Sequence, residues 1–115
     1  MKAHLSKEDV RKYLTTIRFD SYLIDSLLPD LTGHDHRPSA FLVYLMLWHA
    51  ARVAKQKGVA FSYQEIATRT GLAKRTVQLA VRHLANRRLI AVEQASLTAT
   101  PVYTVLSPWR RDKKN

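Results

Sequence analysis

The spacing of apolar residues near the start of the chain predicts an amphipathic helix. Val10, Tyr13, Leu14 and Ile17 recur at the i, i+3, i+4 and i+7 positions that form one stripe along a helix. Ser6 precedes them as a helix-capping residue. The apolar side of such a helix needs a packing partner.

A second short helix is predicted from Ser21 and is expected to stop near Pro29, because a proline inside a helix removes a hydrogen bond and crowds the preceding turn. Residues 32–38 then have the composition of a polar loop that contains Gly33. The apolar residues of the predicted helix are Leu23, Ile24, Leu27 and Leu28.

The longest apolar run, residues 40–48, predicts a long helix with Ser39 as its N-cap and Gly58 as its stop. Because the run is apolar on every side for two turns, it must be covered all round, either by the chain's own helices or by a second subunit. Both options remain open at this point. The run is far shorter than the ~18 residues that span a bilayer, and the N-terminus lacks a signal-peptide pattern, so we expect a soluble, cytoplasmic protein without membrane contact.

The sequence after residue 58 predicts two short helices joined by a tight turn. Ser62 and Glu65 have the spacing of a capping box, in which each side chain bonds the backbone of the other residue. The helix that starts there is expected to end at Gly71, with Leu72 as the buried residue of the turn, and the next helix to cover about residues 74–87. Two short helices with a glycine-containing turn are typical of a helix-turn-helix motif.

Strand-like runs follow the second helix. Residues 89–92 and 102–106 are rich in β-branched and apolar types, and the loop at 95–101 separates them, which predicts a hairpin; residues 59–61 fit one further short strand. The predicted fold class is mainly α with a small β-hairpin wing (α+β), a winged helix-turn-helix with an N-terminal helical extension. We assign residues 1–38 to the extension, 39–106 to the winged helix-turn-helix domain and 107–115 to a basic flexible tail.

From about residue 39 to 106 the chain resembles bacterial winged helix-turn-helix domains of transcription regulators and of plasmid or phage replication proteins. Ala73 departs from that pattern, since such domains usually place a serine N-cap there, and Arg88 stands where a glycine usually ends the second helix. The residues that carry the resemblance are 62–67, 70–77, Leu84, Leu89 and Ile90.

The positive charge of the chain is concentrated in one region. The 115 residues include 19 Lys and Arg against 9 Asp and Glu, a net charge of +10. Residues 1–51 are neutral overall, residues 52–88 carry nine cations against Glu65, and residues 89–115 add two positive charges. A regional excess within a folded chain indicates a polyanion-binding surface, usually for nucleic acid, although a solubilising face is the plainer alternative.

The helix predicted at 74–87 has two distinct sides. Its wheel places Val77, Ala80, Val81 and Leu84 toward the core. The resemblance implies that the opposite side lies in the major groove of double-stranded DNA, where arginine suits guanine, glutamine suits adenine and an apolar side chain suits the thymine methyl. The base contacts expected on this ground are Arg75, Gln78, Leu79 and Arg82.

Contacts to DNA phosphates are expected from other hydroxyl, amide and basic groups. The predicted wing loop has neither lysine nor arginine, so its threonines and the basic tail are the candidates beside the helices. The residues expected to contact the DNA backbone are Ser62, Tyr63, Lys74, Thr76, Asn86, Thr98, Thr100, Arg110 and Arg111.

No pattern of residues indicates catalysis or a cofactor. The chain has no cysteine, which excludes disulfides, thiolate metal sites and cysteine nucleophiles. His34, Asp35 and His36 are adjacent possible metal ligands, but they lack a second spaced pair, so we interpret them as a surface loop and expect no metal and no cofactor. The chain is not expected to be an enzyme.

The function predicted from the sequence is sequence-specific binding of double-stranded DNA by a transcriptional regulator. A homodimer is predicted through the N-terminal helices and the 40–57 helix, because their apolar surface exceeds what a minimal winged helix needs. Two alternatives stay open. One is a DNA-binding module of a replication initiator or accessory protein, and the other is a winged helix that contacts proteins and not DNA.

Overall fold

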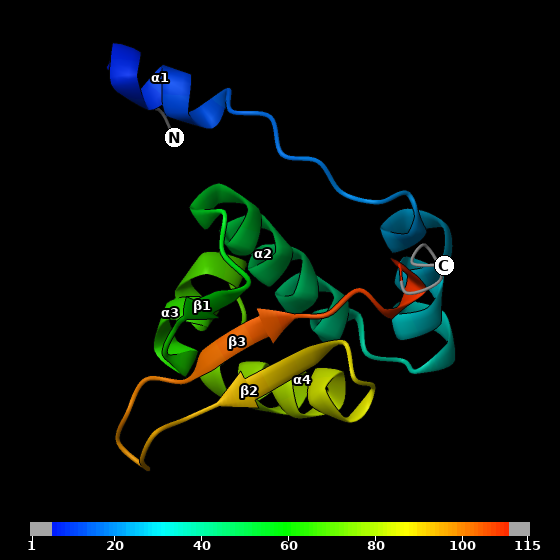
Figure 1. Cartoon of the computed structure of the whole chain (residues 1–115). Coiled ribbons are helices and arrows are strands. Elements are labelled where there is room, and N and C mark those ends of the chain that lie inside the picture. Colours follow the sequence, from blue (N-terminus) through cyan, green and yellow to red (C-terminus); the bar gives the residue numbers. More distant parts are fainter. Residues whose placement is uncertain (1–5, 111–115) are drawn as a thin grey trace.

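A computed structural model gives the fold of residues 6–110, and the side chains of residues 8 and 9 are outside its description. Figure 1 shows one body of helices packed on a small sheet, with the first helix standing apart from it. The elements are α1 (Lys7–Tyr13), the π-helical segments η1 (Leu23–Leu27) and η2 (Asp30–His34), α2 (Pro38–Ala54), β1 (Gly58–Ala60), α3 (Tyr63–Thr70), α4 (Lys74–Asn86), β2 (Ile90–Glu93) and β3 (Val102–Val105).

The order of the elements from α2 to β3 is that of a winged helix-turn-helix. The three strands form an antiparallel sheet in the order β1-β3-β2. Tyr103 of the central strand pairs with Val59 on one side and with Val92 on the other. The fold class predicted from the sequence is therefore confirmed, including the hairpin that forms the wing.

The local signals of the helix-turn-helix are present as predicted. Ser62 accepts from the Glu65 amide and Glu65 accepts from the Ser62 amide, which completes the capping box of α3. Gly71 ends α3 with φ 78°, a left-handed conformation that a residue without Cβ adopts easily. Ala73 provides no side-chain cap to α4, and Arg88 follows α4 with φ 58°.

Both ends of α2 differ from the prediction. Arg37 is the N-cap and Pro38 occupies the first turn, so Ser39 lies inside the helix. Proline suits this position because its fixed φ is helical and its missing N–H would be unpaired there anyway. The helix ends at Ala54, where Lys55 adopts a left-handed φ of 56°, and Gly58 begins β1 rather than stopping α2.

The predicted helix stop near Pro29 is wrong. The chain stays helical on both sides of Pro29, and residues 30–34 belong to η2 rather than to a polar loop. The turns widen here to bonds that span five residues: the Leu28 amide donates to the Leu23 carbonyl, and the Asp35 amide donates to the Asp30 carbonyl at 2.9 Å. A widened turn leaves more room for the proline ring than a regular α-helical turn does.

One hydrophobic core joins the N-terminal extension to the winged helix. The segment η1 packs on η2, η2 packs on α2, and α2 in turn packs on α4 and the sheet. The cover that the apolar run on α2 requires is thus supplied in part by the chain itself, although Leu42 remains 44% exposed. The largest fully buried side chains are Leu23, Leu31, Val43, Tyr44, Leu47, Ile66, Val77, Leu84 and Tyr103.

Residues 107–110 are packed against this body, so the tail predicted to be flexible from residue 107 is ordered as far as Arg110. The Trp109 ring stacks on Tyr22 at a centroid distance of 4.5 Å and on Trp48 at 6.2 Å. Its Nε1–H donates to Asp20 at 2.6 Å. This contact connects the end of the described chain to the segment before η1.

No helix within residues 6–110 has the length and apolar character that crossing a membrane requires.

Removal of the hydroxyl group from two buried tyrosines is expected to change the free energy of unfolding in opposite directions. The Tyr44 hydroxyl donates to the Leu106 carbonyl at 2.7 Å, whereas the buried Tyr103 hydroxyl has no hydrogen-bond partner among the described residues. Chemical denaturation should show that Tyr44→Phe lowers the free energy of unfolding by about 1–2 kcal/mol and that Tyr103→Phe raises it by about 1 kcal/mol. Equal losses for both variants would contradict this difference.

The left-handed conformation of Arg88 is expected to cost stability. Arg88→Gly should raise the free energy of unfolding by about 1 kcal/mol, because glycine adopts a positive φ without steric conflict. Arg88→Ala is the matched control, since it removes the same charge but keeps the Cβ. If the alanine variant gains as much as the glycine variant in thermal denaturation, charge and not backbone strain is the cause.

Candidate nucleic-acid interface

The helix α4 is fixed in the body by its apolar side. Val77, Ala80, Val81 and Leu84 are all buried, as the wheel predicted. They pack α4 against α2, α3 and β2. Because these residues point inward, the opposite side of α4 faces outward in its first turns, whereas His83 and Arg87 near its C-terminal end contact Asp35.

The outward side of α4 presents cations that form no ion pair with the described part of the chain. Lys74, Arg75 and Arg82 are exposed. Within residues 6–110, none of the three has a carboxylate oxygen within 4 Å. Gln78 and Leu79 lie between Arg75 and Arg82 and are half-buried. The four residues predicted to contact bases therefore share one side of one helix.

The start of α4 offers backbone donors. Ala73 is the N-cap and makes no side-chain bond to the first turn, so the first amides of a 13-residue helix have no side-chain acceptor from the cap. Amides at a helix N-terminus and the positive end of its dipole attract anions. Thr76 is half-buried in this turn, and Lys74 is exposed beside it.

The beginning of α3 contributes Ser62 and Tyr63, both half-buried. The Ser62 oxygen accepts from the Glu65 amide, which leaves its hydroxyl proton to donate elsewhere. Asn86 is exposed at the other end of α4. These are positions from which hydroxyl and amide groups are able to donate to phosphate oxygens.

The wing between β2 and β3 is organised by Gln94. Its side-chain amide donates to the carbonyls of Leu97 and Ala99, at 3.3 and 2.7 Å. Thr98 and Thr100 are exposed, and Leu97 at the tip is 97% exposed. The wing thus presents hydroxyl and apolar groups, and the sequence provides no cation in it.

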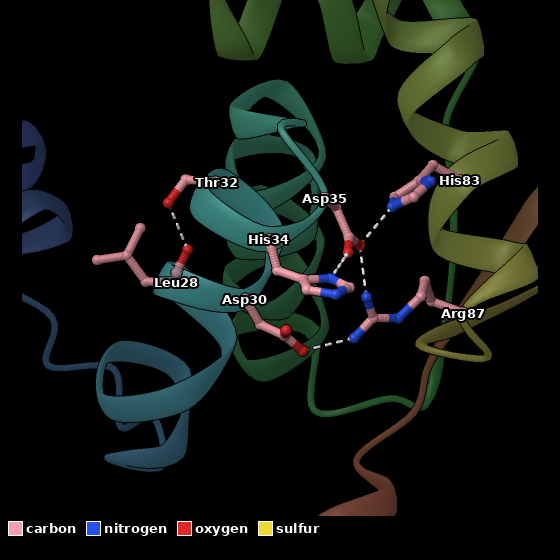
Figure 2. Close-up of polar contacts among 7 residues, drawn as sticks. All are labelled: Leu28, Asp30, Thr32, His34, Asp35, His83 and Arg87. Carbon is pink, nitrogen blue, oxygen red and sulfur yellow. Dashed lines mark hydrogen bonds and ion pairs between the residues drawn. The ribbon is translucent and has the colours of Figure 1, made fainter.

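A polar network holds the C-terminal half of α4 to η2. Figure 2 shows the Asp35 carboxylate between His34, His83 and Arg87. His83 donates to Asp35 at 2.7 Å and His34 donates at 2.8 Å, while Arg87 bonds Asp35 through Nη1 and Asp30 through Nη2, the latter at 2.6 Å. The N-terminal extension is therefore bonded directly to the helix that carries the candidate interface.

The interpretation of residues 34–36 as a surface loop is wrong for Asp35, whose side chain is only 7% exposed. Burial by itself raises the pKa of the Asp35 carboxyl, but the hydrogen bonds from His34 and His83 and the charge of Arg87 outweigh it and lower the pKa to about 2. A signal existed in the sequence: residues 83 and 87 are four apart, a spacing that places them together on one helix side.

The same network includes three potential metal ligands. Asp30, His34 and Asp35 have ligand atoms within 4.8 Å of one another. The Arg87 guanidinium contacts both carboxylates and balances their negative charge, so these carboxylates do not require a metal ion. The pKa of Arg87 is raised, first by its hydrogen bond to Asp30. We therefore propose no metal site here.

The Arg110 side chain is bound within the protein, so we do not propose it as a DNA contact. Its Nε and Nη2 both donate to Asp20 at 2.7 Å. The hydrogen bond from Arg110 is the main reason that the pKa of the Asp20 carboxyl is lowered to about 2. Arg111, the other tail residue expected to contact DNA, lies outside the described residues.

Comparison with known proteins yields one solved structure. Neither a protein-family model nor a curated protein matches this sequence. Among solved structures, the chain is similar to the antimony-specific transcriptional repressor AntR, with 15% identity and a TM-score of 0.45 over 97% of this chain and 78% of that chain. The fold assignment rests on the element order and strand pairing of the chain itself.

The depressed pKa values of Asp20 and Asp35 predict acid sensitivity. Each carboxylate is more acidic folded, at about 2, than at the unperturbed value of 3.8, so its stabilising effect is complete above pH 4 and is lost as the pH falls toward 2. Asp35→Asn should remove up to about 2 kcal/mol of the difference in unfolding free energy between pH 7 and pH 2.

The matched control is Asp25→Asn, which removes an exposed carboxylate that makes no ion pair within the described part of the chain. Urea denaturation across this pH range should give the control the acid dependence of the natural protein. An Asp35→Asn variant with that same dependence would show that the Asp35 network does not carry it.

Proposed function

We propose that this protein binds double-stranded DNA sequence-specifically by placing α4 in the major groove, and that it acts as a transcriptional regulator. The observation that carries the proposal is the outward side of α4, where Arg75 and Arg82 are exposed and have no carboxylate partner within residues 6–110. Donors that the protein itself does not use remain available to a ligand.

The charge of the surrounding region supports a polyanionic partner. Residues 52–88, which include α3 and α4, hold nine of the 19 cations of the chain and only one acid. Attraction to phosphates is long-ranged and independent of sequence, so this charge would bring DNA to the helix. A single α-helix fits the major groove, where the base pairs present distinct hydrogen-bonding patterns.

We assign the contacts that recognise bases to the middle of the outward side of α4. Arg75 and Arg82 are seven residues apart, with Gln78 and Leu79 between them, a spacing that aligns all four along one helix side. Each arginine is suited to guanine O6 and N7, Gln78 to adenine, and Leu79 to a thymine methyl group. These contacts would set the preferred sequence.

Phosphate contacts are assigned to groups around that side. The first turn of α4 contributes open amides together with Lys74 and Thr76. Such contacts fix the position of the helix on the duplex but read no sequence. The other groups assigned to this role are Ser62, Tyr63, Asn86, Thr98 and Thr100.

The Asp35 network has a positioning role in this proposal. Because Asp35 bonds both His83 and Arg87, it holds the C-terminal part of α4, which begins directly after the predicted base contact Arg82. A helix fixed at both its apolar side and its C-terminal end presents its side chains with little freedom, which favours sequence discrimination. Two copies of the chain, as in the predicted homodimer, would present two such helices to adjacent half-sites.

Regulation of transcription and initiation of replication both use this kind of binding. Selection of bound sequences from a random duplex library, followed by their location in the genome, separates the two. Sites near promoters support the regulator, whereas sites confined to an origin support the replication alternative.

Substitutions on α4 test the assignment of roles. Arg75→Ala or Arg82→Ala should weaken binding to the selected sequence by about 1–3 kcal/mol and relax the preference at one base pair, whereas Lys74→Ala should weaken binding to every sequence alike. Lys57→Ala is the charge-matched control, because Lys57 is exposed but lies outside α3 and α4. Fluorescence anisotropy with selected and scrambled duplexes measures both effects.

The salt dependence of the same titrations decides between DNA and protein contact. Release of counterions makes the affinity for a duplex fall as salt rises. Absence of binding at low salt, or binding that salt does not affect, would favour the winged helix that contacts proteins. An equal loss on all duplexes for Arg75→Ala, Arg82→Ala and Lys74→Ala would contradict base reading by the two arginines.

A further inference from the structure

The helix α1 is formed but has an uncovered apolar side. Val10, Tyr13 and Leu14 lie on the stripe predicted from the sequence and are 40%, 67% and 74% exposed. Figure 1 shows α1 standing away from the body at the end of an extended segment. Isolated helices shorter than about 12–15 residues are marginal in water, and α1 has seven, so its stability requires a surface against which the stripe packs.

The body has an apolar groove of about 510 Å³ that is open on one side. The apolar residues that line it include Leu42, Leu45 and Met46 of α2 and Ile17 and Phe19 of the extended segment. The other lining residues are Trp48, His49, Arg69 and Thr70. Leu42 and Phe19 are 44% and 48% exposed, so the groove leaves large apolar side chains in water. Its volume is in the range of pockets that enclose drug-sized ligands, and it has room for several side chains.

The connection between α1 and the groove is too short for α1 to pack into the groove of its own chain while its last turn stays helical. Helical hydrogen bonds continue past α1 to the amides of Leu14 and Thr15. Ile17 already lines the groove, so Thr16 alone remains to reverse the direction of the chain. Reversals between packed elements use about two to five residues. Packing in the same chain would therefore require the end of the helix to unwind.

We propose that α1 of one copy packs its Val10–Tyr13–Leu14 stripe into the α2 groove of a second copy, and that the second copy returns the same contact. Within residues 6–110, each chain has this uncovered stripe and this uncovered groove, so a two-fold exchange covers both on each copy. The partner is another molecule of this chain. The inference does not depend on DNA binding.

This arrangement leaves the DNA-binding side free. None of the residues that line the groove belongs to α4, and those from α3 are Arg69 and Thr70 at its C-terminal end. The exchange also answers the question that the sequence left open about the apolar run on α2. Part of that run is covered by η2, and the remaining part, around Leu42, is covered by the second copy.

Engineered cysteines test which chain supplies the helix. The natural chain has no cysteine, so Leu14→Cys and Leu42→Cys introduce the only thiols. Leu14→Cys protein mixed with Leu42→Cys protein, treated with a short bismaleimide, should give a covalent dimer. A chain that carries both substitutions should also give covalent dimers. Internally cross-linked monomer from the double variant would show packing within one chain and overturn the proposal.

Leu97→Cys provides the background for random collision, since Leu97 is almost fully exposed on the wing, away from the groove. Mixed with Leu42→Cys, it should give far less covalent dimer than Leu14→Cys does. Equal yields from both mixtures would mean that the cross-link reports collision and would overturn the assignment of α1 to the groove.

Complementation between two defective variants tests the exchange itself. Tyr13→Ser/Leu14→Ser damages the helix and Leu42→Arg damages the groove, all at exposed positions, so both variants should keep the natural circular dichroism spectrum. Sedimentation equilibrium from about 1 to 100 µM should show the dissociation constant of the dimer raised about tenfold or more for each variant alone.

Mixing the two variants should restore dimer, because a mixed pair contains one intact helix in one intact groove. Leu97→Ser, the matched control, should dimerise like the natural chain. A natural chain that stays monomeric across this range would overturn the proposal, and so would a mixture that dimerises no better than its two components.

Discussion

The contact between Asp35 and the end of α4 connects the two parts of this molecule. A carboxylate that is almost fully buried accepts hydrogen bonds from His34, His83 and Arg87, and without those donors its charge would be costly to bury. The contact fixes η2 against α4, and η2 in turn packs on α2. The orientation of the candidate interface therefore depends on residues that precede the winged helix in the sequence.

The features that the sequence predicted correctly depend on neighbouring residues. The capping box at Ser62 and Glu65, the turn at Gly71 and the strained end of α4 at Arg88 involve residues a few positions apart, so their chemistry can be read from a short segment. The side of α4 that carries Arg75 and Arg82 was predictable for the same reason, because helical spacing fixes which residues share a side.

The features that the sequence did not predict join residues far apart. Asp35 meets His83 across 48 positions, and Asp20 meets Trp109 across 89, and no local pattern announces such pairs. The helix stop predicted near Pro29 was wrong for a different reason. The proline rule assumes regular α-helical hydrogen bonds. Here the packing of Leu23, Leu27 and Leu31 in the core stabilises a wider helix that accommodates the proline ring.

The stacking of Trp109 on Tyr22 and Trp48 changes how shortened versions of this protein should be interpreted. Residues 107–110 resemble a dispensable basic appendage in the sequence, yet removing them would strip an aromatic cover from Trp48 and leave the Asp20 carboxylate without its donors. A truncation designed to ask whether the end of the chain touches a ligand would thus report on the integrity of the body, and single substitutions are the cleaner way to assign function near this terminus.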